Sequence, residues 1–165
     1  MTRPHPNALI WLWLSAVVIV ADQITKHIAL ALLEPYQPVP VLPGFNWMLA
    51  FNEGAAFSFL ADAGGWQRWF FTVMALAVSA VLAWWLSRTP RGHWQDALPF
   101  ALIIGGALGN AIDRMIHARV VDFVQIYYDR WSWPAFNVAD SAISVGAVLV
   151  LLLALRQSLH RRKKE

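Results

Sequence analysis

Four long apolar segments constrain this chain more than any other feature of its sequence. They cover residues 8–33, 69–86, 97–116 and 138–155. Each approaches the roughly 20 residues that an α-helix needs to cross about 30 Å of hydrocarbon. Charged residues make up only 14% of the chain, whereas soluble domains contain about 25%. We therefore predict an all-α membrane protein in which residues 1–165 form a single domain with four transmembrane helices.

The first apolar segment has a second interpretation, as a signal peptide. Arg3 would be its charged region and residues 29–31 its cleavage site. However, Asp22, Gln23 and Lys26 separate the apolar run from that site. A retained span is therefore the favoured interpretation.

The distribution of Lys and Arg predicts the orientation of the four spans, because cytoplasmic loops are enriched in these residues. The side that holds both termini carries eight of them and the other side carries five, so we expect cytoplasmic termini and a basic cytoplasmic tail at 156–165. Membrane topology also explains the formal net charge of +3 better than a nucleic-acid partner does. Eight of the ten acids lie on the outer, periplasmic side: Asp22, Glu34, Glu53, Asp62, Asp113, Asp122, Asp129 and Asp140.

The outer segment 34–67 has two kinds of pattern. Four prolines between residues 34 and 44 favour extended chain, and the alternation of apolar and other residues over 45–52 predicts a strand. Residues 55–66 contain Phe57, Phe59 and Trp66, which suit a short helix lying flat on the membrane. We therefore expect a small extended or β segment and an interfacial helix on the outer face.

Polar residues recur at helical spacing within the spans. Asp22 and Lys26 stand at i and i+4, the favourable order for an ion pair, and structural support is the favoured role for them. The glycines at 105, 106 and 109 permit close helix approach. Two sets spaced i, i+3, i+4 and i+7 each share one helix face, which we predict looks into a polar cavity: Asn110, Asp113, Arg114, His117; and Asn137, Asp140, Ser141, Ser144. Structural hydrogen bonding is the alternative for any one of them.

Two acids in apolar surroundings, Asp122 and Asp140, are the candidate catalytic residues. If their carboxyl groups meet, they share one proton, so one can deprotonate a water while the other polarises a peptide carbonyl. This chemistry needs no Cys, and the chain has none. Asp140 lies near a helix N-terminus, which favours its ionised form, whereas Asp122 stands between Val121 and Phe123 and would hold the proton more easily. The alternative is that Asp140 only caps its helix.

Five motifs, which occur in the family's order along the chain, make it resemble the bacterial lipoprotein signal peptidase (signal peptidase II) family. Members of this family are intramembrane aspartic peptidases. The motifs are ADQITK at 21–26, FNEGAAFS at 51–58, GGALGNAIDR at 105–114, VVDF at 120–123 and FNVADS at 136–141. Any one of these motifs is weak evidence. The five together extend over all four predicted spans.

This resemblance implies an enzyme of the bacterial cytoplasmic (inner) membrane that removes signal peptides from diacylglyceryl-modified prolipoproteins just before the lipidated cysteine. We expect no metal, no cofactor and no nucleic-acid partner. The expected binding partners besides the substrate are membrane lipids and globomycin-type cyclic peptide inhibitors, and the expected oligomeric state is a monomer. The active site would lie near the periplasmic face, with segment 34–67 covering the substrate. The matching residues are Asp122 and Asp140 for catalysis, Asp22 and Lys26 for support, and a substrate cleft of Asn52, Gly54, Asn110, Asp113, Arg114, Asn137 and Ala139.

A proton- or cation-coupled transporter is the main alternative, because intramembrane Asp, Arg and His also serve as relays. Against it, the sequence shows no inverted repeat or pair of broken helices, and its acids gather at one face. A non-catalytic membrane assembly factor is a third possibility.

Overall fold

The computed structural model describes residues 6–54 and 65–162. Among these residues there are four long helices, α1 (Leu12–Leu32), α2 (Gln67–Arg88), α3 (Trp94–His117) and α4 (Val138–Arg162), with a short 3-10 turn, η1 (Ala8–Trp11), before α1. All four are long and apolar enough to cross a membrane, with η1 and α1 forming one span. The predicted four-helix membrane architecture is therefore confirmed.

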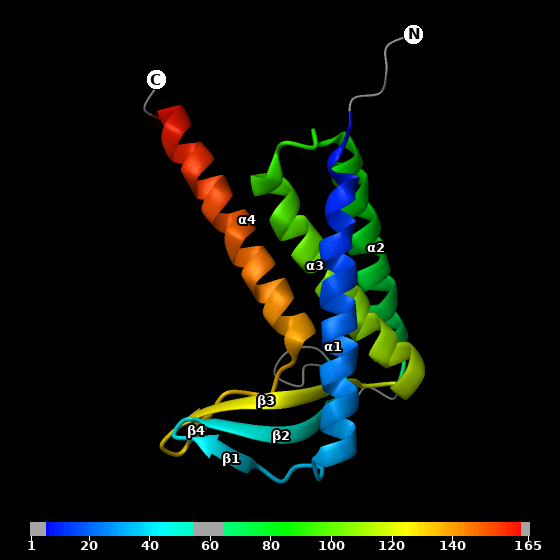
Figure 1. The fold of residues 1–165 in the computed structure, drawn as a ribbon, viewed down its shortest axis with the longest axis vertical. Helices are drawn as coiled ribbons and strands as arrows, with labels where there is room; N and C mark the ends of the chain where they lie inside the picture. Colours follow the sequence, from blue (N-terminus) through cyan, green and yellow to red (C-terminus); the bar gives the residue numbers. More distant parts are fainter. Residues whose placement is uncertain (1–5, 55–64, 163–165) are drawn as a thin grey trace.

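The helices surround α3, and α4 leans away from the others toward its C-terminal end (Figure 1). Three glycines let α3 approach its neighbours closely. A side-chain Cβ at Gly105 would lie 2.8 Å from the Cβ of Val18 in α1, and one at Gly109 would lie 2.8 Å from Asp22 Oδ2. At Gly106 it would collide with the carbonyl oxygen of Ala139 in α4. These contacts place α3 against both α1 and α4 at the level of the polar residues.

Replacing Gly106 with Ala should therefore destabilise the fold by about 1–3 kcal/mol, the usual cost of forcing extra atoms into a close-packed contact. The added methyl would meet backbone, the Ala139 carbonyl, as well as the Ile143 side chain. Thermal unfolding in detergent measures the effect. Gly92→Ala is the control, because nothing lies within 4 Å of a Cβ there, and equal melting of the two variants would contradict the packing argument.

A four-stranded antiparallel sheet of order β1-β2-β3-β4 lies across the end of the bundle where α1 ends and α4 begins (Figure 1). Its strands are β1 (Val39–Leu42), β2 (Phe45–Asn52), β3 (Val120–Tyr128) and β4 (Trp131–Ser132). The strand predicted over 45–52 is confirmed as β2. β3 and β4 lie between the third and fourth predicted spans, where no strand is predicted, so the sheet is larger than the small β segment expected within 34–67.

One predicted helix cannot be compared with the structure over most of its length, and another extends beyond its predicted end. Most of the interfacial helix predicted at 55–66 lies outside the described residues, and Gly65 and Trp66 form a turn before α2. The fourth helix continues to Arg162, well past the predicted boundary at 155. Residues 147–162 contain no Gly or Pro to end it, so the start of the basic tail is helical.

Candidate active site

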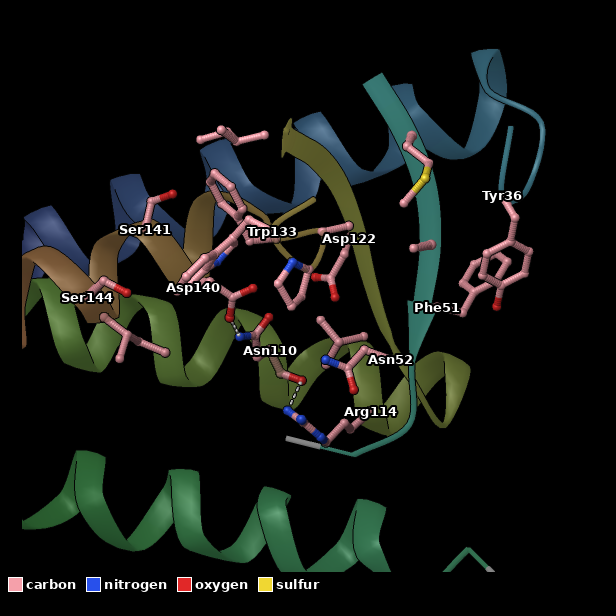
Figure 2. A pocket seen from close by; sticks show the side chains of 18 of the residues that line it. Tyr36, Phe51, Asn52, Asn110, Arg114, Asp122, Trp133, Asp140, Ser141 and Ser144 are labelled. Atoms are coloured by element: carbon pink, nitrogen blue, oxygen red, sulfur yellow. Dashed lines mark hydrogen bonds between the residues drawn. The ribbon is translucent and has the colours of Figure 1, made fainter. Parts of the chain in front are cut away.

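The two candidate catalytic acids reach one cavity from different elements. Asp122 lies on β3, opposite Ala50 of β2, and is buried, whereas Asp140 lies in the first turn of α4 and is half-buried. Both line a cavity of about 990 Å³. Figure 2 shows the two carboxyl groups turned toward the same space, with Asn110 beside them. Asp122 is thus held by a sheet rather than by a loop.

Two asparagines connect the carboxyl groups. Asn137 Nδ2 donates hydrogen bonds to Asp122 Oδ1 (2.7 Å) and to Asn110 Oδ1 (3.2 Å), and Asn110 Nδ2 donates to Asp140 Oδ1 (2.8 Å). Each amide therefore holds one carboxylate while the two amides contact each other. The positions of Asp122 and Asp140 are fixed relative to each other through α3 and the start of α4.

Asp140 is also the capping acid that the alternative interpretation expected. Its Oδ2 accepts a hydrogen bond from the backbone N–H of Asn137 (3.3 Å), and its own N–H donates to Asn137 Oδ1 (2.8 Å). This reciprocal arrangement is a capping box. Asp140 caps α4 with one oxygen and contacts Asn110 with the other, so capping and a place in the cavity occur together.

Burial raises the pKa of Asp122 from its usual value near 4 to about 7, and the nearby charge of Asp140 acts in the same direction. The positive charge of Lys26 and hydrogen bonds from Asn137 and Asn52 lower the same pKa, but more weakly. Asp122 therefore keeps its proton up to a much higher pH than an ordinary aspartate does. This shift places it among residues typical of functional sites.

A buried ionic cluster lies behind the two asparagines. Lys26 Nζ is 2.7 Å from Asp22 Oδ2, 2.8 Å from Asp113 Oδ2 and 3.0 Å from Asn110 Oδ1. Both acids also accept hydrogen bonds from backbone: Ala139 N–H donates to Asp22 (2.9 Å) and Val121 N–H donates to Asp113 (3.0 Å). The cluster thereby attaches the start of α4 and the start of β3 to α1 and α3.

Arg114 points from α3 toward the end of β2. Its Nη2 donates to the carbonyl oxygen of Gly54 (2.8 Å), and its guanidinium lies over the Phe71 ring of α2, 5.1 Å from the centroid. Nη1 donates weakly to Asn110 O (3.4 Å), and Nε has no hydrogen-bond partner among the described residues. The Gly54 N–H in turn donates to Asn52 Oδ1 (3.0 Å). Arg114 therefore fixes the turn that follows β2.

The predicted cleft residues divide into two groups. Asn52, Asn110 and Arg114 line the large cavity with the two acids. Gly54, Asp113, Asn137 and Ala139 do not line it; each contributes a backbone or side-chain contact within the surrounding polar network. Asp113 in particular belongs to the ionic cluster, together with Asp22 and Lys26, which are the predicted supporting pair.

Gln23 is a site residue that was not predicted. Its Nε2 donates to Asp113 Oδ1 (2.8 Å) and to Gly109 O (3.3 Å). Gln23 follows Asp22 inside the first motif, which is the signal that could have identified it. The apolar wall of the cavity was not predicted either; it is formed by Tyr36, Met48, Phe51, Ile126, Trp131, Trp133, Ile143 and Val145.

No group of three or more His, Cys, Asp or Glu side chains in residues 6–54 and 65–162 is arranged to hold a metal ion. The chemistry available to the cavity is that of two carboxyl groups, amide donors and one guanidinium beside an apolar wall. Such a set can activate a water and polarise a carbonyl.

Comparisons with known proteins agree over nearly the whole chain. The family model described as signal peptidase (SPase) II matches residues 14–156. The chain is 58% identical over 165 residues to a lipoprotein signal peptidase of Xylella fastidiosa (strain M12), covering 99% of each. It is 57% identical over 162 residues to one of Xanthomonas campestris pv. campestris (strain 8004), covering 98% of this chain and 97% of that protein.

Two solved structures described as bacterial membrane enzymes have the same fold. The structure determined in meso at 2.3 Å resolution superposes with a TM-score of 0.83 at 26% identity and covers 99% of each chain. The structure at 1.9 Å resolution gives a TM-score of 0.76 at 26% identity and covers 94% of this chain and 98% of that one.

Proposed function

Because the chain belongs to the signal peptidase (SPase) II family of aspartic peptidases, we propose that Asp122 and Asp140 are its catalytic dyad. The enzyme is a multi-pass membrane lipoprotein signal peptidase, and prolipoproteins are its substrates. The finer proposal is that it cleaves diacylglyceryl-modified prolipoproteins just before the lipidated cysteine. The observation that carries it is the pair of carboxyl groups on one cavity, connected through Asn137 and Asn110.

In the proposed reaction the dyad starts with one proton. Asp140, in the first turn of α4, acts as the base: it takes a proton from a water molecule, and the oxygen of that water attacks the scissile carbonyl carbon. Asp122, protonated because of its raised pKa, gives its proton to the carbonyl oxygen. Collapse of the tetrahedral diol breaks the C–N bond: Asp140 gives the proton that it took from water to the leaving nitrogen, and Asp122 takes a proton back from one hydroxyl of the diol. The dyad then again shares one proton.

The rest of the cavity supports binding of an extended, lipid-modified peptide. Amide groups of Asn52 and Asn110 and the guanidinium of Arg114 are placed to donate hydrogen bonds to peptide carbonyls. Acyl chains would lie against the apolar wall that includes Ile143 and Val145 of α4. Each buried CH₂ contributes about 0.8 kcal/mol to the binding free energy, so a lipidated substrate would bind much more tightly than an unmodified one.

Cleavage of a purified prolipoprotein, with and without its diacylglyceryl group, tests this proposal. We expect release of the signal peptide from the modified form and at least about a 10²-fold lower kcat/KM for the unmodified form, because remote binding energy contributes to transition-state stabilisation. A C-terminal tag on the substrate would report the size of the product. Equal rates would contradict the proposed role of the apolar wall.

The proposed mechanism also predicts a pH dependence. Activity requires Asp122 protonated, so kcat/KM should fall about ten-fold per pH unit above pH 7, as the residue loses its proton. Asn52→Ala should move this fall to higher pH, because the Asn52 hydrogen bond lowers the pKa of Asp122. Asn46→Ala is the control on the same strand, since Asn46 donates to Gln125 instead. A profile flat up to pH 9 would exclude Asp122 as the proton donor.

We further propose the orientation expected from the sequence, with both termini in the cytoplasm of a bacterium and the sheet on the periplasmic face of its inner membrane. Arg88 and Arg91 lie at and after the end of α2, and Arg156 and Arg161 lie near the end of α4, which agrees with the positive-inside rule.

One chain supplies both acids, so a monomer suffices. The described part of segment 34–67, including β1 and β2, would cover the peptide, and globomycin-type cyclic peptides would occupy the same cavity. The transporter alternative is not favoured.

A further inference from the structure

A second cavity, of about 390 Å³, lies beside the active site and shares none of its described lining residues. It is formed where α2 begins, where α3 ends and where the chain leaves β2. Its described lining is Glu53, Gly65, Gln67, Arg68, Trp69, His117, Ala118 and Arg119. Its size lies within the range of small-ligand sites, and the proposed peptidase mechanism assigns it no role.

Two guanidinium groups on this cavity have no carboxylate partner among the described residues. Arg68 lies over the Trp69 ring, 4.6 Å from its centroid, and Arg119 lies over the Phe51 ring at 3.6 Å. Stacking on a ring orders a guanidinium and leaves its N–H donors available at the edge. Glu53 is the single acid in the described lining, so this described lining is net positive even when His117 is neutral. A planar, multiply hydrogen-bonding cation of this kind matches a phosphate.

The position of the cavity in the bundle indicates where the phosphate comes from. α2 begins at Gln67 and α3 ends at His117, so the cavity lies at the ends of two predicted spans, where phospholipid headgroups are found. The exposed rings of Trp66 and Trp69 at this level are typical of a membrane interface.

An exposed apolar stripe leads from the cavity along α2. Trp69, Val73 and Leu76 stand at i, i+4 and i+7, so they share one helix face, and each is about half exposed or more. Acyl chains can lie along this stripe while the phosphate is held between Arg68 and Arg119.

We propose that this cavity binds the headgroup phosphate of an anionic phospholipid of the surrounding bilayer. The lipid would join the start of α2 to Arg119, which directly precedes the strand that carries Asp122. It would therefore stabilise the end of the sheet next to the active site. Free phosphate could satisfy the same guanidinium groups but not the stripe on α2.

Native mass spectrometry of the purified full chain in neutral detergent tests this, with phosphatidylglycerol and phosphatidylcholine as probes. We expect tighter retention of phosphatidylglycerol, and at least about a ten-fold increase in its apparent Kd in the double variant Arg68→Gln/Arg119→Gln, equivalent to losing one charge-assisted hydrogen bond. Millimolar inorganic phosphate should not displace the lipid. Arg68→Gln alone, expected to act in the same direction, serves if the double variant does not fold.

The matched control is Arg88→Gln/Arg91→Gln, at the other end of α2, where Arg88 also lies over a tryptophan ring, that of Trp84. This variant should bind phosphatidylglycerol as the unmodified chain does. Unchanged lipid binding in the Arg68 variants would overturn the proposal, as would equal retention of phosphatidylcholine or displacement by inorganic phosphate. The readout does not involve peptide cleavage, so its outcome is independent of the proposed peptidase mechanism.

Discussion

Asparagine in place of either Asp122 or Asp140 should lower the rate of signal-peptide release by about 10⁴-fold or more, the usual loss when a member of a catalytic unit is removed. Each variant retains one carboxyl group, but the dyad then cannot both accept a proton from water and donate one to the carbonyl. The two losses should not add in the double variant, because the pair acts as one unit. Release of the signal peptide by the purified variants measures this.

The substitutions are informative because asparagine preserves the structural roles of both acids. In Asp140→Asn the new amide oxygen can still accept the hydrogen bond from the Asn137 N–H, so the cap on α4 is retained. In Asp122→Asn the amide oxygen can likewise accept from Asn137 Nδ2. Melting temperatures should therefore stay close to that of the unmodified enzyme. Loss of activity in a well-folded variant then reports chemistry and not capping.

Asp129→Asn is the matched control. Asp129 lies at the turn between β3 and β4, is exposed, and has a positive φ of 52° that asparagine tolerates well. It should leave cleavage unchanged. If a folded Asp122→Asn or Asp140→Asn variant instead kept more than about a tenth of the activity, far above the activity expected of a broken dyad, the two-aspartate mechanism would be wrong.

The helices were predictable because a membrane span is a local property of the sequence. A run of about 20 apolar residues needs no partner to be recognised, and each predicted span overlaps one of the observed helices. β3 was not predictable in the same way. Residues 120–123 are all buried, so the strand starts without the alternation that identifies a half-exposed strand. Most of its paired residues lie opposite β2, and two helices, α2 and α3, separate β2 from β3 along the chain.

Helical spacing placed Asn110, Asp113, Arg114 and His117 on one face of α3, but it did not predict the direction in which each is used. His117 is exposed and lines the second cavity instead of the one that holds the two acids. Asp113 and Arg114 are adjacent and both buried, yet Asp113 contacts Lys26 of α1 while Arg114 contacts Gly54 after β2. That division depends on where α1 and the sheet lie relative to α3. Spacing within one helix carries no such information, so it could not distinguish the supporting residue, Asp113, from the cavity residue, Arg114.

Lys26→Met should be the most destabilising single change in the polar cluster, by about 3–5 kcal/mol, since it leaves buried carboxylates without their cation. Lys26 is almost fully buried, at 1% exposure, and both Asp22 and Asp113 depend on the same Nζ. Methionine keeps much of the apolar volume, so the loss reports charge more than packing. Thermal and denaturant unfolding in detergent measure it, with Arg91→Met, at an exposed cation, as the control.

A second substitution separates an uncompensated charge from a merely disrupted core. Asp22→Asn in the Lys26→Met background removes one of the two stranded carboxylates while its oxygen can still accept from Ala139 N–H. The double variant should therefore be more stable than Lys26→Met alone, although each substitution destabilises the unmodified enzyme. Such a coupling is expected only for residues that interact directly. Additive losses would show that Lys26 acts through packing, and the ionic cluster would then not be what holds β3 and α4 in place.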